Sequence, residues 1–327
     1  MTGIRHFTRF ALVAAVALGA AACASGGAGA PEPRRYAVIV GIDDYPGTDA
    51  DLDGSVADAQ AMRQLLMEQY GFRDGDIRML LNGQARRSNI INAFRQHLGQ
   101  AQPNDVVVFY FSGHGMQLND NYLLHPPVDN EPDGRDESIV VWDDSGDIGV
   151  IVDDELGFLT DELQARRALV MIDACHSGTV TRASGVLARQ LEFSRVADDV
   201  VIPQEMMPAM ARWAADAEAT DSRVANWGAI TTRGEMRHLL LSGSAPDEVS
   251  WAMGNLPGFS GMHGLFTTRF ITALRAADAS TTFAQVMNGV RSEVRETSRR
   301  RTGDYQTPQI EGAHMQSSVW EFFGRTQ

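Results

Sequence analysis

The sequence of 327 residues contains no lysine and only two cysteines. All 28 basic residues are therefore arginines, which we attribute to genome composition rather than to mechanism. The two cysteines, Cys23 and Cys175, are too few for a disulfide framework to hold the fold together. Excess positive charge is also missing. The formal net charge of −14 argues against nucleic acid as a partner and mildly favours basic ligands.

The apolar run near the N-terminus, residues 10–22, is too short for a comfortable membrane span. Because it follows two arginines and precedes small residues, it predicts a secretory signal over residues 1–23. The three alanines before Cys23 resemble a lipobox, so we expect lipidation of Cys23; an ordinary signal-peptidase site at the same alanines is the alternative. We therefore predict an exported protein, either periplasmic or an outer-membrane lipoprotein, with residues 24–34 as a Gly/Ala/Pro-rich tether.

The remaining body, residues 35–323, reads as one domain, because 44% hydrophobic content is ample for a globular core. In its first third, apolar runs of strand length alternate with segments of helical periodicity. This β-α-β-α-β order predicts a mostly parallel sheet with helices on both faces. The expected elements are strands over 35–42, 77–81 and 105–112 and helices over 56–70 and 90–98.

The pattern weakens farther along the chain. Residues 116–154 are rich in acids and predict a polar loop with short extended pieces at 122–125 and 138–142. Residues 180–236 show weak periodicity and are interpreted as an insertion that carries a short helix around 205–219. The other expected elements are a helix over 153–166, strands over 169–172 and 239–241, a helix opened by residues 263–267, a helix over 283–295 and a last strand over 318–322.

Two short motifs stand where predicted strands end. One apolar run stops at Asp-Ala-Cys175-His-Ser-Gly, and an earlier one stops at Ser-Gly-His114-Gly. The carboxyl ends of neighbouring parallel strands meet at one edge of a sheet, where ligands bind. A thiol beside an imidazole at that edge is the arrangement that nucleophilic cysteine catalysis needs. His176 would point to the opposite face of the strand, so we assign it no proton transfer.

The motif SGHG followed by DACHSG resembles the metacaspases, especially their bacterial members, and their caspase relatives. The resemblance covers roughly residues 35–180 and 237–323. It implies an α/β fold, a caspase-like three-layer sandwich with a mostly parallel central sheet, and a cysteine endopeptidase activity. It also implies that Cys175 is the nucleophile and His114 the base, and that the N–H groups of Gly115 and Cys175 form the oxyanion hole.

The same resemblance implies a specificity pocket with two acids at its base. Asp173 would share a face with Cys175 on an extended chain, and Asp58 aligns with the second pocket acid of metacaspases. Two carboxylates suit an Arg or Lys side chain, so the expected cleavage is after basic residues. Ser244 lies in the segment that resembles the family's substrate-binding loop, and we expect it to bind substrate.

No cofactor is expected to be required for the chemistry, but calcium is a candidate activator. Asp136, Asp153 and Asp154 resemble the acids that bind calcium in many metacaspases, and carboxylate oxygens are suitable ligands. Arg182 stands where those relatives often carry another Asp, and a cation there would weaken the site. We therefore treat these three acids as a candidate calcium site only.

The insertion supplies candidate sites of self-cleavage, because a flexible loop beside an arginine-specific site is an easy substrate. The candidates are Arg182, Arg189, Arg195, Arg212, Arg223 and Arg233. The expected partners are peptides or proteins with basic residues, without nucleic acid, and with a membrane only through the lipid anchor; a monomer is expected. Two alternatives stay open: a catalytically silent caspase-fold binding module of the envelope, and a Cys/His amidase of the cell wall.

Overall fold

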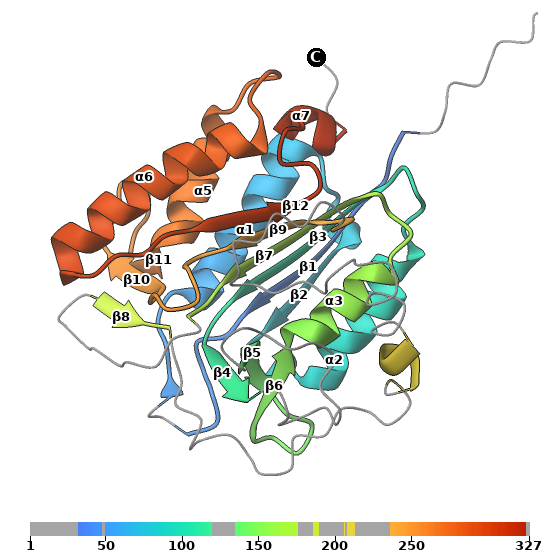
Figure 1. Cartoon of the computed structure of the whole chain (residues 1–327), viewed down its shortest axis with the longest axis horizontal. Coiled ribbons are helices and arrows are strands. Elements are labelled where there is room, and N and C mark those ends of the chain that lie inside the picture. The colour runs from blue at the N-terminus through green and yellow to red at the C-terminus, as the bar shows by residue number, and fades with distance from the viewer. Residues whose placement is uncertain are drawn as a thin grey trace, which may run out of the picture. The chain divides into compact units, whose positions relative to one another are not determined.

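A six-stranded sheet lies at the centre of the computed structural model (Figure 1). In spatial order its strands are β12 (Gln309–Gly312), β9 (Leu239–Ser242), β7 (Arg167–Asp173), β3 (Val106–Ser112), β1 (Arg35–Gly41) and β2 (Ile77–Leu81). All are parallel to their neighbours except the edge strand β12. The structure describes residues 32–47, 50–119, 135–175, 186–189, 206, 208–212 and 236–324.

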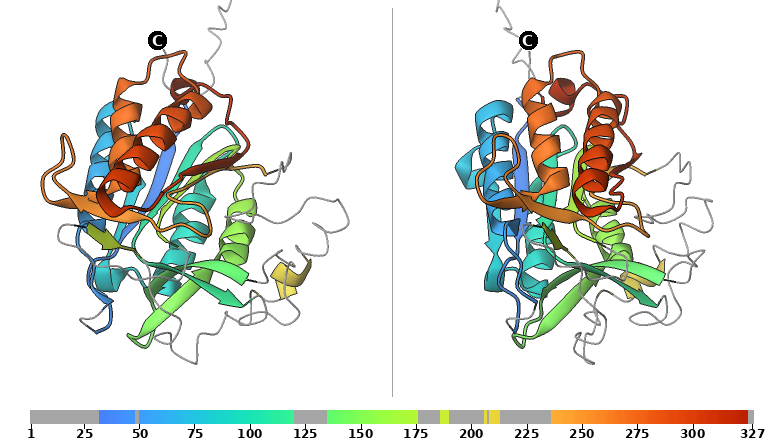
Figure 2. Two further views of the ribbon diagram at one scale, coloured as in Figure 1. Left: turned by 60° about the vertical axis from the view of Figure 1, so that its left-hand side comes forward. Right: turned by 90° about the vertical axis from the view of Figure 1, so that its left-hand side faces the viewer.

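Helices cover both faces of this sheet (Figure 2). One face carries α1 (Ser55–Tyr70), α5 (Leu265–Ala276) and α6 (Phe283–Thr302), and the other carries α2 (Arg87–Asn92) and α3 (Asp153–Asp161). Alternate residues of β1 belong to the two separate hydrophobic cores between these layers. Because such strands are buried on both faces, they appear in the sequence as continuous apolar runs. The predicted three-layer α/β sandwich is confirmed.

Two small antiparallel sheets flank the central one. The first contains β4 (Gly115–Asn119), β5 (Arg135–Trp142) and β6 (Ile148–Val152). The second contains β11 (Met262–Gly264), β10 (Trp251–Gly254) and β8 (Val186–Ala188). The polar loop predicted for residues 116–154 is therefore wrong for residues 116–119, 135–137 and 148–152, which lie on paired strands, whereas the extended piece expected at 138–142 lies within β5. The extended piece expected at 122–125 lies outside the described residues.

Several predicted boundaries also need correction. The last strand expected over 318–322 is instead the short helix α7 (Val319–Phe322), because the Ser318 side chain accepts the Glu321 N–H and caps a helical turn. The helix that begins at Asp153 ends at Asp161, not at residue 166. Of the short helix expected around 205–219, residues 208–212 are described and are helical.

The pairing of β3 with β7 prepares the site. Ser112 lies opposite Asp173, the last residue of each strand, so the two motifs leave the sheet side by side. Within the part of the chain described here, no helix combines the length and the apolar character needed to span a membrane. The predicted signal and tether up to residue 31, with Cys23, and most of the predicted insertion lie outside the described residues.

Candidate active site

Cys175 and His114 each lie two residues beyond a strand end, at the carboxyl edge of the central sheet. Both are buried, with 0% and 4% of their surface exposed. The backbones of the two motifs are in direct contact, because a Cβ atom on Gly115 would overlap the carbonyl oxygen of Cys175. Only glycine at position 115 permits this approach. The sequence prediction that these motifs meet at one sheet edge agrees with this geometry.

The thiol of Cys175 is held by the backbone of Ser250. The Ser250 N–H donates to Sγ over 2.8 Å, and the thiol donates to the Ser250 carbonyl oxygen over 3.0 Å. Burial raises the pKa of the Cys175 thiol to about 12, although these backbone contacts oppose the shift. In this state the sulfur is therefore a protonated thiol at neutral pH. A nucleophilic attack from it requires a base that removes the proton as the bond forms.

Ala50 and Tyr45 orient the side chain of His114. Its Nε2 lies 2.8 Å from the Ala50 carbonyl oxygen. Because a carbonyl oxygen only accepts hydrogen bonds, Nε2 carries the proton and donates it. In the neutral ring this leaves the lone pair on Nδ1, so Nδ1 is the basic nitrogen. The Tyr45 ring packs against the imidazole with centroids 4.9 Å apart, and its hydroxyl accepts the His114 backbone N–H over 2.8 Å.

A guanidinium fills the pocket between the two predicted acids. Arg189, Asp58 and Asp173 are all fully buried. Nη2 of Arg189 lies 2.6 Å from Asp58 Oδ2, and Nη1 lies 3.1 Å from Asp173 Oδ2. Burial disfavours the charge, but the carboxylates of Asp173 and Asp58 outweigh it and hold the pKa of the Arg189 guanidinium above its usual value. The structure thus brings Asp58 and Asp173 together around one buried guanidinium, and their binding of a substrate side chain stays a prediction.

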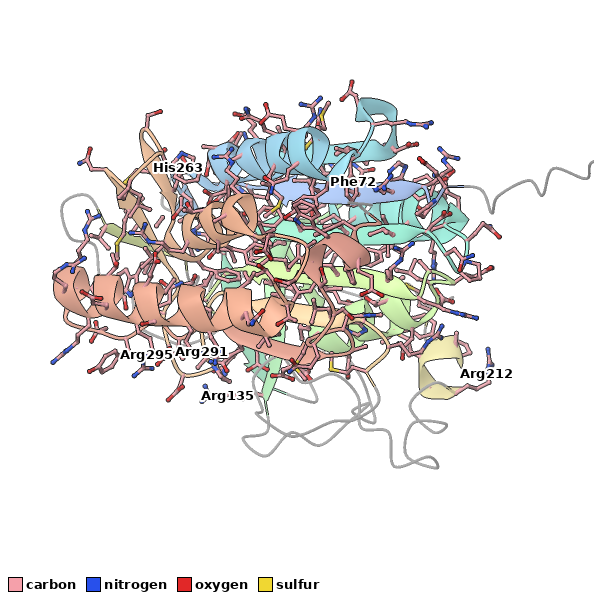
Figure 3. The ribbon with its side chains drawn as sticks, turned by 90° about the horizontal axis from the view of Figure 1, so that it is seen from above. Phe72, Arg135, Arg212, His263, Arg291 and Arg295 are labelled. Atoms are coloured by element: carbon pink, nitrogen blue, oxygen red, sulfur yellow. The ribbon has the colours of Figure 1, made fainter. Side chains whose placement is uncertain are left out.

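Other groups orient the two carboxylates. Asp173 Oδ2 accepts the Thr267 hydroxyl over 2.6 Å, and its Oδ1 accepts the Ser250 hydroxyl over 2.7 Å. Asp58 Oδ2 accepts the Gly264 N–H, and its Oδ1 lies 2.8 Å from Nδ1 of His263. Figure 3 shows His263 at one end of the body, which marks where the pocket lies. Because each carboxylate is held by several donors, its oxygens are fixed for a bound cation.

The main chain of Arg189 is bound as well as its side chain. The N–H groups of Gly115 and Cys175 both donate to the Arg189 carbonyl oxygen, each over 3.1 Å. The Arg189 N–H donates to the Ser250 carbonyl oxygen over 3.1 Å. Two convergent N–H groups on one carbonyl oxygen are the arrangement that an oxyanion hole requires. The structure therefore brings the N–H groups of Gly115 and Cys175 together, and their role as an oxyanion hole stays a prediction.

Gly264 leaves the room that the guanidinium occupies. A Cβ atom there would overlap Asp173 Oδ2 and lie 2.8 Å from Nη1 of Arg189. Its φ of −60° is open to any residue, so Gly264→Ala changes the pocket rather than the backbone. We expect Gly264→Ala to lower the free energy of unfolding by about 1–3 kcal/mol, because it overpacks this buried pocket. Gly289→Ala is the matched control, because nothing lies within 4 Å of a Cβ there. Equal denaturant stability of the two variants would contradict this assignment.

The segment that resembles the family's substrate-binding loop contacts Arg189 through Ser250, and not through Ser244, which we expected to bind substrate. Ser244 is buried, and its carbonyl oxygen accepts the Ser242 hydroxyl. Gln306, which the sequence analysis did not select, supports the loop. Its Nε2 donates to the Ser250 hydroxyl over 3.0 Å, and its Oε1 accepts the Trp251 N–H. Most of these contacts use backbone atoms, which leave no signal in the identity of the residue.

The candidate calcium ligands Asp136, Asp153 and Asp154 are buried. In the described ranges, no group of three or more His, Cys, Asp or Glu side chains is placed to hold a metal ion, so the three acids do not form a site by themselves. Arg182 lies outside these ranges. Calcium activation stays a prediction, and no chemical step below depends on it.

Comparison with known proteins gives consistent matches. The family model described as the caspase domain matches residues 34–319. Metacaspase-3 of Arabidopsis thaliana is 29% identical over 89% of this chain and 74% of its own length. Metacaspase-1 of Schizosaccharomyces pombe is 34% identical over 44% of this chain, and the match spans only 34% of that relative.

Protein GSU0716 of Geobacter sulfurreducens has a similar fold, with a TM-score of 0.56, 21% identity and coverage of 88% of this chain and 98% of its own. Caspase-1 of Spodoptera frugiperda has a TM-score of 0.50, 14% identity and coverage of 90% and 92%.

Proposed function

Since the chain belongs to the caspase-domain family of cysteine peptidases, we propose that it hydrolyses peptide bonds that follow arginine or lysine. One observation carries this proposal. Arg189 has its guanidinium between Asp58 and Asp173 while its carbonyl oxygen accepts the N–H groups of Gly115 and Cys175. A basic side chain in that pocket therefore places its own carbonyl group at the nucleophile. The acidic pocket has no evident use in an amidase of the cell wall, and the family relationship does not favour a silent binding module.

The proposed mechanism assigns one task to each group. The substrate carbonyl oxygen binds the Gly115 and Cys175 N–H groups, which would stabilise the negative charge that develops there. His114 takes the proton of the Cys175 thiol as Sγ attacks the carbonyl carbon, and then gives it to the leaving amine. Water hydrolyses the resulting thioester and regenerates the thiol. The high pKa of the thiol in the occupied site supports base-assisted attack rather than a preformed thiolate.

The pocket favours arginine over lysine. Two different guanidinium nitrogens reach two different carboxylates, and Nη1 also donates to the Ser112 hydroxyl over 2.7 Å. A lysine offers one nitrogen at its end and cannot reproduce this planar fork. We therefore propose that lysine is accepted less well than arginine.

The test is hydrolysis of matched fluorogenic peptides that end in Arg, Lys, Asp or neutral citrulline. We expect Cys175-dependent turnover in the order Arg, then Lys, with Asp and citrulline lower by a factor of about 10² or more, since each would leave two buried carboxylates without a cation. Cys175→Ala is the control for a contaminating protease. Equal hydrolysis of the Arg and citrulline peptides would refute the specificity, and silence on all four would refute the activity.

We also propose that the enzyme is exported and that Cys23 carries a lipid. This proposal rests on the N-terminal pattern alone. Cell fractionation of the wild type and Cys23→Ser tests it, because the variant should leave the membrane fraction. Wild type and variant both in the soluble fraction would favour the ordinary signal-peptidase site instead, and both in the membrane fraction would rule out Cys23 as the anchor.

A further inference from the structure

A short piece of the insertion is bound across the candidate active site. Strand β8, Val186–Ala188, pairs antiparallel with β10, so that Val186 lies opposite Met253 and Ala188 opposite Trp251 (Figure 1). Addition of an extended segment to the edge of a sheet is a common way to bind a peptide. The next residue after this strand is Arg189.

The contacts of Arg189 go beyond those of a structural ion pair. A buried arginine with a structural role needs partners for its guanidinium, which Asp58 and Asp173 provide. It has no need for a carbonyl oxygen shared between Gly115 N–H and Cys175 N–H. Main chain and side chain together hold Arg189 as a peptidase holds the residue before the bond that it cuts.

We infer that Val186–Arg189 is an intramolecular substrate that fills the site of the intact chain, and that Arg189–Gln190 is the bond the enzyme cuts in itself. This inference rests on the proposed function. Two of the six candidate arginines, Arg189 and Arg212, lie in the described part of the insertion, and of these two Arg189 occupies the pocket while Arg212 is exposed. The recognised sequence before the cut is Val-Leu-Ala-Arg.

The reaction is an ordinary hydrolysis. Sγ of Cys175 forms a thioester with the Arg189 carbonyl carbon, the bond from that carbon to Gln190 N breaks, and His114 transfers the thiol proton to the departing amine. Water then cleaves the thioester. The products are an Arg189 carboxylate, a new amino group on Gln190 and the regenerated thiol.

Occupation by the chain itself also predicts inhibition before the cut. A tethered segment competes with external peptides at an effective concentration in the millimolar range. External substrates should therefore bind weakly to the intact chain. Once the bond to Gln190 is broken, the segment is held from one side only and can leave the pocket.

Self-cleavage is tested by intact-mass and terminal sequencing of the full chain. We expect Cys175-dependent fragments that end at Arg189 and begin at Gln190, with a half-life independent of protein concentration, as for an intramolecular reaction. Arg189→Gln should abolish this cut. Arg212→Gln should not, because Arg212 is exposed and lies at the opposite end of the body from His263 (Figure 3). Cleavage at another arginine while Arg189–Gln190 stays intact would overturn the inference.

Inhibition by the tethered segment is tested by measuring how tightly a peptide binds to variants that lack Cys175 and cannot cleave it. The probe is acetyl-Val-Leu-Ala-Arg-amide. It is titrated into three proteins: the single variant Cys175→Ala, the double variant with Arg189→Gln and the double variant with Arg212→Gln. We expect at least about tenfold tighter binding for the Arg189→Gln combination, because its pocket has lost the tethered competitor. The Arg212→Gln combination should match Cys175→Ala. Equal affinities of all three proteins would overturn the occupied-site model.

Gln190→Pro is a second variant that blocks the cut without removing Arg189, so it separates loss of cleavage from misfolding of Arg189→Gln. It keeps Arg189 and its ion pairs but turns the bond to be cut into a tertiary amide without an N–H. We expect no cut at Arg189 and no gain in peptide affinity from this variant. If arginine peptides are hydrolysed while the wild-type chain stays whole, only this inference fails. If no variant hydrolyses them, the proposed function fails with it.

Discussion

Asp173→Asn is expected to lower kcat/KM for a peptide ending in arginine by about 30- to 4,000-fold. Asp173 is fully buried, and its Oδ2 lies 3.1 Å from a guanidinium nitrogen. Removal of one partner of a buried, hydrogen-bonded charge pair costs about 2–5 kcal/mol, and each 1.4 kcal/mol is about a factor of ten. The variant keeps the shape of the side chain, so the loss reports the charge. Steady-state kinetics with wild-type protein as reference measures it.

The neutral arginine analogue citrulline sharpens this experiment. The wild type should discriminate strongly between the arginine and citrulline peptides, and Asp173→Asn should lose most of that discrimination. Asp74→Asn is the matched control, because Asp74 forms an exposed ion pair with Arg63 away from the pocket. An Asp173→Asn enzyme with unchanged preference for arginine would mean that the carboxylate does not bind the substrate cation.

The central sheet was predictable because its strands are buried on both faces. Strand β3 is buried at every position and appears in the sequence as an uninterrupted apolar run that ends at a glycine-rich motif. The alternation of such runs with helical periodicity is sufficient to predict a parallel sheet, and parallel strands must bring their carboxyl ends together. This is why the edge that holds Cys175 and His114 could be located from the residues alone.

The flanking sheets were less predictable, because their polar residues are buried. Asp136 and Glu137 on β5 have only 4% and 1% of their surface exposed, although acids in a row favour a solvated loop in any reading of the sequence. At the other end of the body, the segment over 318–322 has the apolar content of a strand. The cap that Ser318 provides makes it a helical turn instead.

The residues of the candidate site also include some that the sequence indicates and some that it does not. The resemblance to metacaspases indicated Asp58 and Asp173, since carboxylates are distinctive residues. In the sequence, nothing distinguishes Arg189 from the other arginines of the insertion. Its place in the pocket depends on the pairing of β8 with β10, and β10 lies more than sixty residues farther along the chain. Ser250 acts mainly through its backbone, and Gly264 acts through the side chain that it lacks. Neither role has a signature in a single sequence.

In the Arg189→Gln background, whose pocket lacks the tethered arginine, His114→Ala should lower kcat for the arginine peptide by about 10²- to 10⁴-fold relative to Arg189→Gln alone. This is the usual contribution of a general acid–base residue, and KM should change little. The split between the two constants follows from the geometry. The pocket contacts of Arg189 come from Asp58, Asp173 and Ser112, so binding of the arginine side chain does not involve the imidazole. Because burial raises the pKa of the Cys175 thiol, loss of the base leaves the sulfur protonated at neutral pH.

The pH profile distinguishes a base from a structural histidine. Without His114, deprotonation must come from solvent, so the residual kcat should rise steadily with pH, because burial holds the pKa of the Cys175 thiol above its usual value. His97→Ala is the control, because the His97 ring contacts the Asp76 carbonyl oxygen on the far side of the fold. A His114→Ala enzyme with the wild-type pH profile and a raised KM would instead show that the imidazole helps to shape the binding site, and another base would have to serve Cys175.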